Sequence, residues 1–255
     1  MNTNAQDGSS RPTVVLVHGA FADGSSWNGV IERLQAEGIR VTAPAVPLRG
    51  ISNDSAYIAS LIDQTPGPVI AVGHSYGGAI ITNAATDTDN VVGLVFVSGF
   101  APDEGERLGE IEDGSKDSVL STAQVPLRYP TGEGQQTAVE IAVDPGKFHD
   151  AFAADLPEEQ AAVMAATQRP VAESAFSEPN GEPAWKKLPS WAVVARGDKA
   201  AGADVVRSMA ERAGAEITEV DGSHVIMVSQ PQVVAEAILN AVAAAPRKED
   251  LRAGR

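Results

Sequence analysis

One stretch decides the fold: Val69-Ile70-Ala71-Val72-Gly73-His74-Ser75-Tyr76-Gly77-Gly78-Ala79-Ile80-Ile81. The apolar run before Gly73 predicts a strand, and the apolar run after Gly78 predicts a helix. Between them lies a G-x-S-x-G pattern, in which the serine stands on a sharp turn from strand to helix. Because the helix begins directly behind Ser75, its free N–H groups favour a developing negative charge at the serine oxygen. By itself, the pattern also fits an ordinary turn whose serine caps a helix.

The composition limits the class of protein. The chain has 255 residues, 43% of them hydrophobic, which is enough for one large α/β domain. It has no cysteine, and its four histidines lack ligand spacing, so we expect neither disulfides nor a metal site. A net charge of −15 argues against nucleic acid and anionic membranes as partners. The polar N-terminus and the lack of long apolar stretches predict a cytoplasmic protein.

Short apolar runs alternate with helical patterns over most of the chain. Strands alternating with helices predict an α/β fold with a doubly wound, mostly parallel sheet of about six strands. We expect Asp54 and Ser229 to be the N-caps of two helices and Tyr57 to lie on a buried helix face. The strands are predicted at residues 13–17, 39–43, 69–73, 91–97, 191–195 and 216–220.

Residues 101–188 interrupt this alternation. They are acidic and rich in glycine and proline, with short helical candidates such as 158–167 and no strong strand. The segment is too long for a simple loop, so we predict a helical cap inserted over the carboxyl edge of the sheet. The predicted α/β core then comprises residues 13–100 and 189–244, with loose tails at 1–12 and 245–255.

Polar residues with catalytic potential follow several of the predicted strands. His18, Ser75, Asp198 and His224 all fall at carboxyl ends, where parallel sheets bind their ligands. A serine hydroxyl needs an adjacent base to act as a nucleophile. Only His149 and His224 follow Ser75 in a base's usual chain order, and only His224 lies on a sheet-edge loop. We therefore predict Ser75 as the nucleophile and His224 as its base.

The acid partner and the oxyanion donors are less constrained. Asp198, Asp103 and Asp221 all follow strands, although Asp221 belongs to an Asp-Gly turn pair. The N–H groups of Tyr76, directly after the nucleophile, and of Ala20, in the loop after the first strand, are the expected oxyanion donors.

Substrate contacts are expected from aromatic and apolar residues near the cap. The same cap residues could instead form a small core of the cap itself. The candidates are Phe21, Phe148, His149 and Phe152, with Met164 and Phe176.

Five motifs along the chain belong together: Val17-His18-Gly19-Ala20-Phe21, Trp27, Gly73-His74-Ser75-Tyr76-Gly77-Gly78, Gly197-Asp198 and Asp221-Gly222-Ser223-His224. With them the chain resembles the α/β-hydrolase superfamily, and most of all the branch that contains plant-type methylesterases and hydroxynitrile lyases. The resemblance implies a sheet without the first two strands of the full fold, and a Ser75–Asp198–His224 triad that needs no cofactor. Cyanogenic lyases have a threonine and a lysine where this chain has Gly19 and Val225, which favours ester hydrolysis.

The sequence thus predicts a serine carboxylesterase that acts on a small-molecule ester through an acyl-enzyme. A lactonase or a perhydrolase on the same triad is an alternative. A non-catalytic ligand-binding protein on a hydrolase scaffold is another. The substrate and the oligomeric state are not predicted.

Overall fold

The computed structural model describes residues 11–132 and 134–245, and almost all of the two predicted tails lies outside these ranges. Its main sheet has six strands in the order β2-β1-β3-β4-β8-β9, all paired in parallel. The predicted parallel sheet of about six strands is therefore confirmed. The strands are β1 (Thr13–Val17), β2 (Val41–Thr42), β3 (Val69–His74), β4 (Val91–Val97), β8 (Ser190–Ala195) and β9 (Glu216–Val220).

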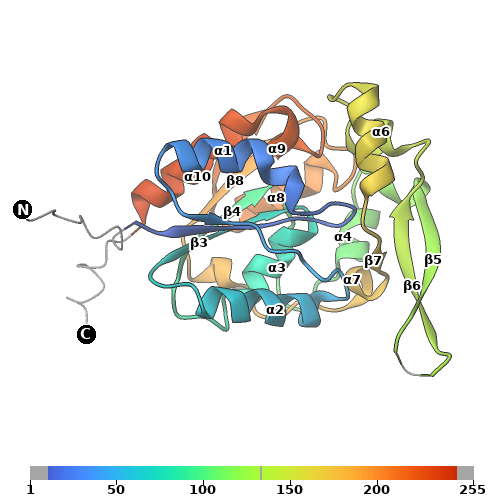
Figure 1. The fold of residues 1–255 in the computed structure, drawn as a ribbon, viewed down its shortest axis with the longest axis horizontal. Coiled ribbons are helices and arrows are strands. Elements are labelled where there is room, and N and C mark those ends of the chain that lie inside the picture. The colour runs from blue at the N-terminus through green and yellow to red at the C-terminus, as the bar shows by residue number, and fades with distance from the viewer. Residues whose placement is uncertain (1–10, 133, 246–255) are drawn as a thin grey trace, which may run out of the picture.

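Helices cover both faces of this sheet (Figure 1). On one face α1 (Asn28–Ala36) packs against α10 (Pro231–Ala244), and on the other α2 (Ile51–Asp63) packs against α3 (Tyr76–Ala84). A further helix, α8 (Ala203–Arg212), contacts β8 and β9. Every residue of β1, β3 and β8 is buried, as expected for continuous apolar runs in a sheet covered on both faces.

Three details of the helices differ from the prediction. Gly50 is the N-cap of α2, and Asp54 lies inside its first turn, where its buried carboxylate accepts hydrogen bonds from the backbone N–H of Arg49. Tyr57 is 43% exposed rather than buried. A short helix, α9 (Ile226–Ser229), precedes α10, so Gln230 rather than Ser229 is the N-cap of α10. The local spacing of apolar residues predicted where these helices lie, but not the residues at which they begin, because tertiary packing determines the helix ends.

Residues 101–188, which we call the cap segment, connect β4 to β8. Its helices are α4 (Leu108–Asp113), α5 (Phe148–Phe152), α6 (Glu158–Thr167) and α7 (Ser174–Ser177), with two 3₁₀ turns at Leu120–Thr122 and Ala184–Lys186. The expectation that it has no strong strand is wrong, because an antiparallel sheet forms in the order β5-β6-β7. These strands are β5 (Gln124–Pro130), β6 (Thr137–Val143) and β7 (Val171–Ala172).

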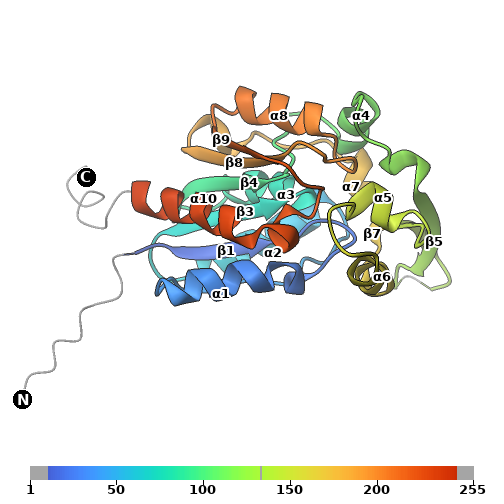
Figure 2. The same cartoon turned by 90° about the horizontal axis from the view of Figure 1, so that it is seen from above.

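Two prolines explain why this second sheet was not predicted from the sequence. Pro126 and Pro130 lie within β5, and proline inside a run argues against a strand. However, β5 is an edge strand that pairs only with β6, and an edge tolerates residues without an N–H. Figures 1 and 2 place β5, β6 and α6 together at one end of the main sheet. The backbone N–H of Phe21, after β1, donates to the carbonyl of Arg169, so the cap segment lies over the carboxyl edge.

Candidate active site

Ser75 occupies a strained turn between β3 and α3. Its φ of 52° and ψ of −124° are unusual for a residue with a side chain, a conformation that costs about 1–3 kcal/mol. Its carbonyl accepts from the N–H groups of Gly78 and Phe100, which hold the turn. A Cβ at Gly73 would lie 2.3 Å from the carbonyl oxygen of Gly77, and one at Gly77 would lie 2.4 Å from that of Val17. Only glycine fits at both positions, which accounts for the G-x-S-x-G pattern.

His224 and Asp198 form a buried hydrogen-bonded pair. Nδ1 of His224 lies 2.8 Å from Oδ2 of Asp198, and each residue is 1% exposed. The other carboxylate oxygen accepts from the backbone N–H groups of Ala200 at 2.9 Å and Ala201 at 3.0 Å. Because the carboxylate accepts, Nδ1 of His224 carries the proton and Nε2 presents its lone pair. This Nε2 is buried and has no hydrogen-bond partner among residues 11–132 and 134–245.

The two competing carboxylates are held elsewhere. Asp103 accepts from Nζ of Lys186 at 2.5 Å, and Asp221 forms an ion pair with Arg196 at 2.9 Å. Of the three candidates, therefore, Asp198 is the one that contacts His224. The other downstream histidine, His149, is bonded instead to the carbonyl of Leu156 within the cap segment.

His18 anchors the loop that follows β1. Its Nδ1–H donates to the carbonyl of Gly19, and its Nε2 accepts from the N–H of Val46, each at 2.9 Å. Burial lowers the pKa of His18 to about 4, so the ring is neutral at physiological pH. With both nitrogens occupied, His18 has a structural role in shaping the loop that carries Ala20.

The two expected oxyanion donors retain free amides. In the part of the chain that the structure describes, neither the N–H of Ala20 nor that of Tyr76 donates to a protein acceptor. The next amide, that of Phe21, is used by the cap segment, and Phe21 itself has a φ of 60°. The Tyr76 hydroxyl donates to the buried carboxylate of Asp54 at 2.8 Å, and burial raises the pKa of this hydroxyl. Only the backbone of Tyr76 is therefore available to a substrate.

The predicted aromatic contacts divide into two groups. Phe148 and Phe152 are fully buried, with ring centroids 4.9 Å apart, and Phe152 lies 4.8 Å from the ring of His224. They form a small core that joins the cap segment to His224. Phe21 contacts the edge of Phe152 at 5.9 Å and also borders an open cavity.

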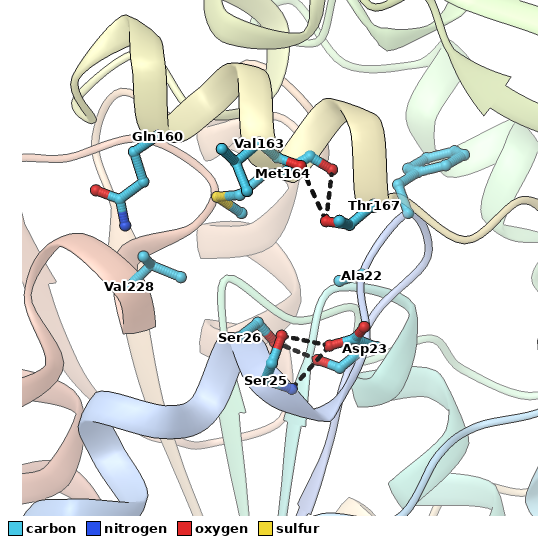
Figure 3. A pocket seen from close by; sticks show the side chains of 10 residues that line it. Ala22, Asp23, Ser25, Ser26, Gln160, Val163, Met164, Thr167 and Val228 are labelled. Atoms are coloured by element: carbon cyan, nitrogen blue, oxygen red, sulfur yellow. Dashed lines mark hydrogen bonds between the residues drawn. The ribbon is translucent and has the colours of Figure 1, made fainter.

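This cavity has a volume of about 220 Å³ and lies between α6 and the 3₁₀ turn Gly24–Trp27 that precedes α1 (Figure 3). Four of the predicted substrate contacts do not line this cavity: Phe148, His149, Phe152 and Phe176. On α6, the lining residues follow the spacing i, i+3, i+4, i+7, a sequence signal that could have identified them. The lining residues are Phe21, Ala22, Asp23, Ser25, Ser26, Gln160, Val163, Met164, Thr167 and Val228.

The described ranges hold neither a metal-binding cluster nor a membrane-spanning helix. Residues 11–132 and 134–245 contain no cluster of three or more histidine, cysteine or acidic side chains able to hold a metal ion. Within the same ranges, no helix combines the length and the apolar character needed to cross a membrane.

Comparison with known proteins assigns the family. Residues 14–237 match the alpha/beta hydrolase family. The chain belongs to this family. Lipase LipV of Mycobacterium tuberculosis is 32% identical over 139 residues, which cover 49% of this chain and 52% of the lipase. A pyrethroid hydrolase of Sphingobium wenxiniae is 26% identical over 164 residues, 57% of this chain and 56% of that enzyme. This family member thus matches about half the length of these two curated relatives.

Solved structures support the same fold. Polyneuridine aldehyde esterase superimposes with a TM-score of 0.75 at 18% identity, covering 91% of this family member and 99% of the esterase. A pyrethroid hydrolase from Sphingobium faniae gives a TM-score of 0.73 at 23% identity, covering 91% and 98%. At these sequence identities the similarity shows that the fold is shared, and nothing more.

Proposed function

We propose that this α/β hydrolase is a serine esterase with Ser75 as nucleophile, His224 as base and Asp198 as the acid that orients the base. One observation carries the proposal: Asp198 holds Nδ1 of the buried His224, and Nε2 of this ring has no partner within residues 11–132 and 134–245. His224 packs against His74, the residue next to Ser75, with ring centroids 4.6 Å apart. Relatives of this chain include a lipase and a carbendazim hydrolyzing esterase, which supports the class of reaction.

The reaction would proceed through an acyl-enzyme. Nε2 of His224 accepts the proton of the Ser75 hydroxyl as its oxygen attacks the ester carbonyl. The amides of Ala20 and Tyr76 donate to the oxyanion, in a buried place where such donors are most effective. The imidazolium then protonates the leaving alcohol, and water attacks the acyl-enzyme with His224 again as base. Asp198 keeps the proton on Nδ1 and stabilises the charged ring.

The cavity beneath α6 is the proposed place for the apolar part of the ester. An apolar cavity of about 150 Å³ accommodates benzene, so about 220 Å³ suits a substituted ring or a medium-length alkyl chain. Asp23 is the one acidic or basic residue of its lining. Hydrogen bonds from Ser25 hold the pKa of Asp23 below its ordinary value, so the carboxylate is charged. A negative charge there favours neutral over anionic substrates.

A substrate panel tests the proposal. Turnover of p-nitrophenyl esters from acetate to decanoate, and of simple lactones, is measured for the wild type and for Ser75→Ala. We expect ester turnover that depends on Ser75, with a preference for medium-length chains. Preferential turnover of lactones would favour a lactonase on the same triad. Wild-type turnover no faster than that of a folded Ser75→Ala protein would contradict the esterase and favour a binding protein.

A further inference from the structure

His74 is a buried imidazole to which the proposed reaction assigns no role. It is the last residue of β3, directly precedes Ser75, and is fully buried. Its Nε2 lies 2.9 Å from the backbone carbonyl oxygen of His224, 150 residues away in the sequence. A carbonyl only accepts, so Nε2 of His74 carries the proton and donates.

The surroundings of His74 keep it in this one state. Its ring lies between His224, at a centroid distance of 4.6 Å, and Trp27, at 6.4 Å in an edge-on arrangement. Burial, with a smaller contribution from His224, holds the pKa of His74 well below its ordinary value, so the ring stays neutral. Nδ1 is buried and finds no partner among the residues that the structure describes. The single hydrogen bond of this ring is therefore the bond to His224.

The topology explains why His224 needs a second anchor. The loop with His224 leaves β9 at the edge of the sheet, whereas Ser75 follows β3, and β4 and β8 lie between them. Three strand spacings amount to about 14 Å, so the loop must fold back across the carboxyl edge to bring the base to the nucleophile. Asp198 fixes the ring of His224, and backbone hydrogen bonds hold the carbonyls of Gly222 and Val225 on either side of it. The carbonyl of His224 itself accepts from His74.

We propose that His74 is a positioning residue, whose Nε2–H holds the carbonyl of His224 so that the imidazole of the base stays in register with Ser75. This inference rests on the esterase function proposed above. His224 is then fixed at two points, its side chain by Asp198 from β8 and its backbone by His74 from β3. Because His74 is covalently next to Ser75, nucleophile and base share one rigid support.

Gly19 supports the same arrangement. A Cβ at this position would lie 2.7 Å from Cβ of Ser75 and 3.0 Å from Nδ1 of His74. A side chain at position 19 would therefore push on both the nucleophile and the imidazole. Gly19 thus leaves room for the His74 ring, in addition to forming the turn after β1.

Two amide variants of equal polarity test the proposal. The amide nitrogen of glutamine reaches the place of imidazole Nε2, whereas that of asparagine reaches only the place of Nδ1. We expect His74→Gln to retain kcat within about threefold. We expect His74→Asn to lose about tenfold to a hundredfold in kcat with little change in KM, since one buried carbonyl loses its donor. Circular dichroism and thermal unfolding of both variants confirm that they fold.

Several outcomes would overturn the positioning role. Equal kcat for folded His74→Asn and His74→Gln would do so, as would a change in KM alone. Imidazole nitrogen NMR of the wild type needs no variant: we expect His74 as the neutral Nε2–H tautomer from pH 5 to 8, and the Nδ1–H tautomer would contradict the bond. The esterase function itself is tested separately by wild-type turnover against Ser75→Ala, so the failure of one proposal is distinguishable from that of the other.

Discussion

The carboxyl edge of the main sheet and the cap segment build their parts of the site in different ways. At the sheet edge, backbone N–H groups hold two of the proposed catalytic residues: those of Ala200 and Ala201 hold Asp198, and those of Gly78 and Phe100 hold Ser75. In the cap segment, the side chains that border the cavity all come from one helix, α6. Of the residues of this helix, Ala161 and Ala165 are the ones that are buried. The edge provides fixed positions, and the cap provides adaptable surface.

This difference suggests a division of labour that mutations can test. Variants at the sheet edge should slow the reaction of every ester to a similar degree, because they remove chemistry. Variants in the cap segment should change which ester is preferred, or how the fold responds to pH, and leave the chemistry in place. Each prediction below either strengthens this separation or breaks it.

The largest expected effect is that of Ser75→Ala. We expect the loss of several orders of magnitude in kcat for all esters alike, because the acyl-enzyme cannot form. Stability should change little, because alanine keeps the Cβ and with it the strained backbone conformation of residue 75. The measurement is turnover with esters of three chain lengths, together with thermal unfolding. A loss confined to one chain length would place Ser75 in substrate selection rather than in chemistry.

Replacing Asp198 by asparagine should have the next largest effect. We expect Asp198→Asn to fold and to lose about a thousandfold or more in kcat, because His224 loses the acceptor that sets its tautomer. Asp103→Asn and Asp221→Asn are matched controls, since both carboxylates pair with surface cations instead, and they should retain most activity. If Asp103→Asn were the inactive variant, the acid would follow the earlier strand.

Glu112, near the end of α4, is buried in the cap segment and should affect stability rather than rate. It is 5% exposed, and burial, with smaller contributions from Asp113 and Asp198, raises the pKa of its carboxyl from 4.5 to about 8. The unfolded chain releases this proton near pH 4.5 and the folded chain only near pH 8. Stability is therefore lost as the pH rises between these values.

Glu112→Gln removes this penalty. We expect it to raise the free energy of unfolding at pH 8 by up to a few kcal/mol and to change it little at pH 4. Denaturant unfolding at both pH values measures the effect. Glu110→Gln, on the exposed side of the same helix, is the control and should show no such dependence. An equal effect of Glu112→Gln at both pH values would mean that its carboxyl is not protonated in the fold.

The smallest effect is expected from filling the cavity. Met164→Trp should lower the ratio of kcat/KM for octanoate to that for acetate by about fourfold for each methylene that loses its apolar contact, since that loss costs about 0.8 kcal/mol. Ala162→Trp, at an exposed position of α6 that does not line the cavity, controls for bulk on the helix. An equal loss for both esters would mean that Met164 acts on the chemistry and not on chain length.

The same contrast decides what could be predicted from the sequence. β1, β3 and β8 were predictable because both of their faces are covered, so every residue is buried and most are apolar. The residues that follow these strands at one sheet edge were predictable as well. The hairpin of β5 and β6 was not predictable. It is held together by pairing between the two strands, and Pro126 interrupts the local sequence pattern by which β5 could have been recognised.

The cavity and the hydrogen bond from His74 to His224 could not be predicted from the sequence for a similar reason. α6 and the turn Gly24–Trp27 are more than 130 residues apart, and nothing in either segment alone indicates that they face each other. His74 is distant from His224 in sequence and in strand order, and only the folded loop brings the two together.

Covalent labelling of Ser75 tests the central claim most directly. The wild type is treated with diethyl p-nitrophenyl phosphate, and the labelled peptide is identified by mass spectrometry. The account predicts one diethylphosphoryl group, on Ser75, formed as p-nitrophenol is released and ester turnover stops. Ser75→Ala should remain unlabelled, and Asp198→Asn should label far more slowly. Ester turnover that persists in a wild type whose Ser75 is fully labelled, or inhibition with the label on another residue, would contradict it.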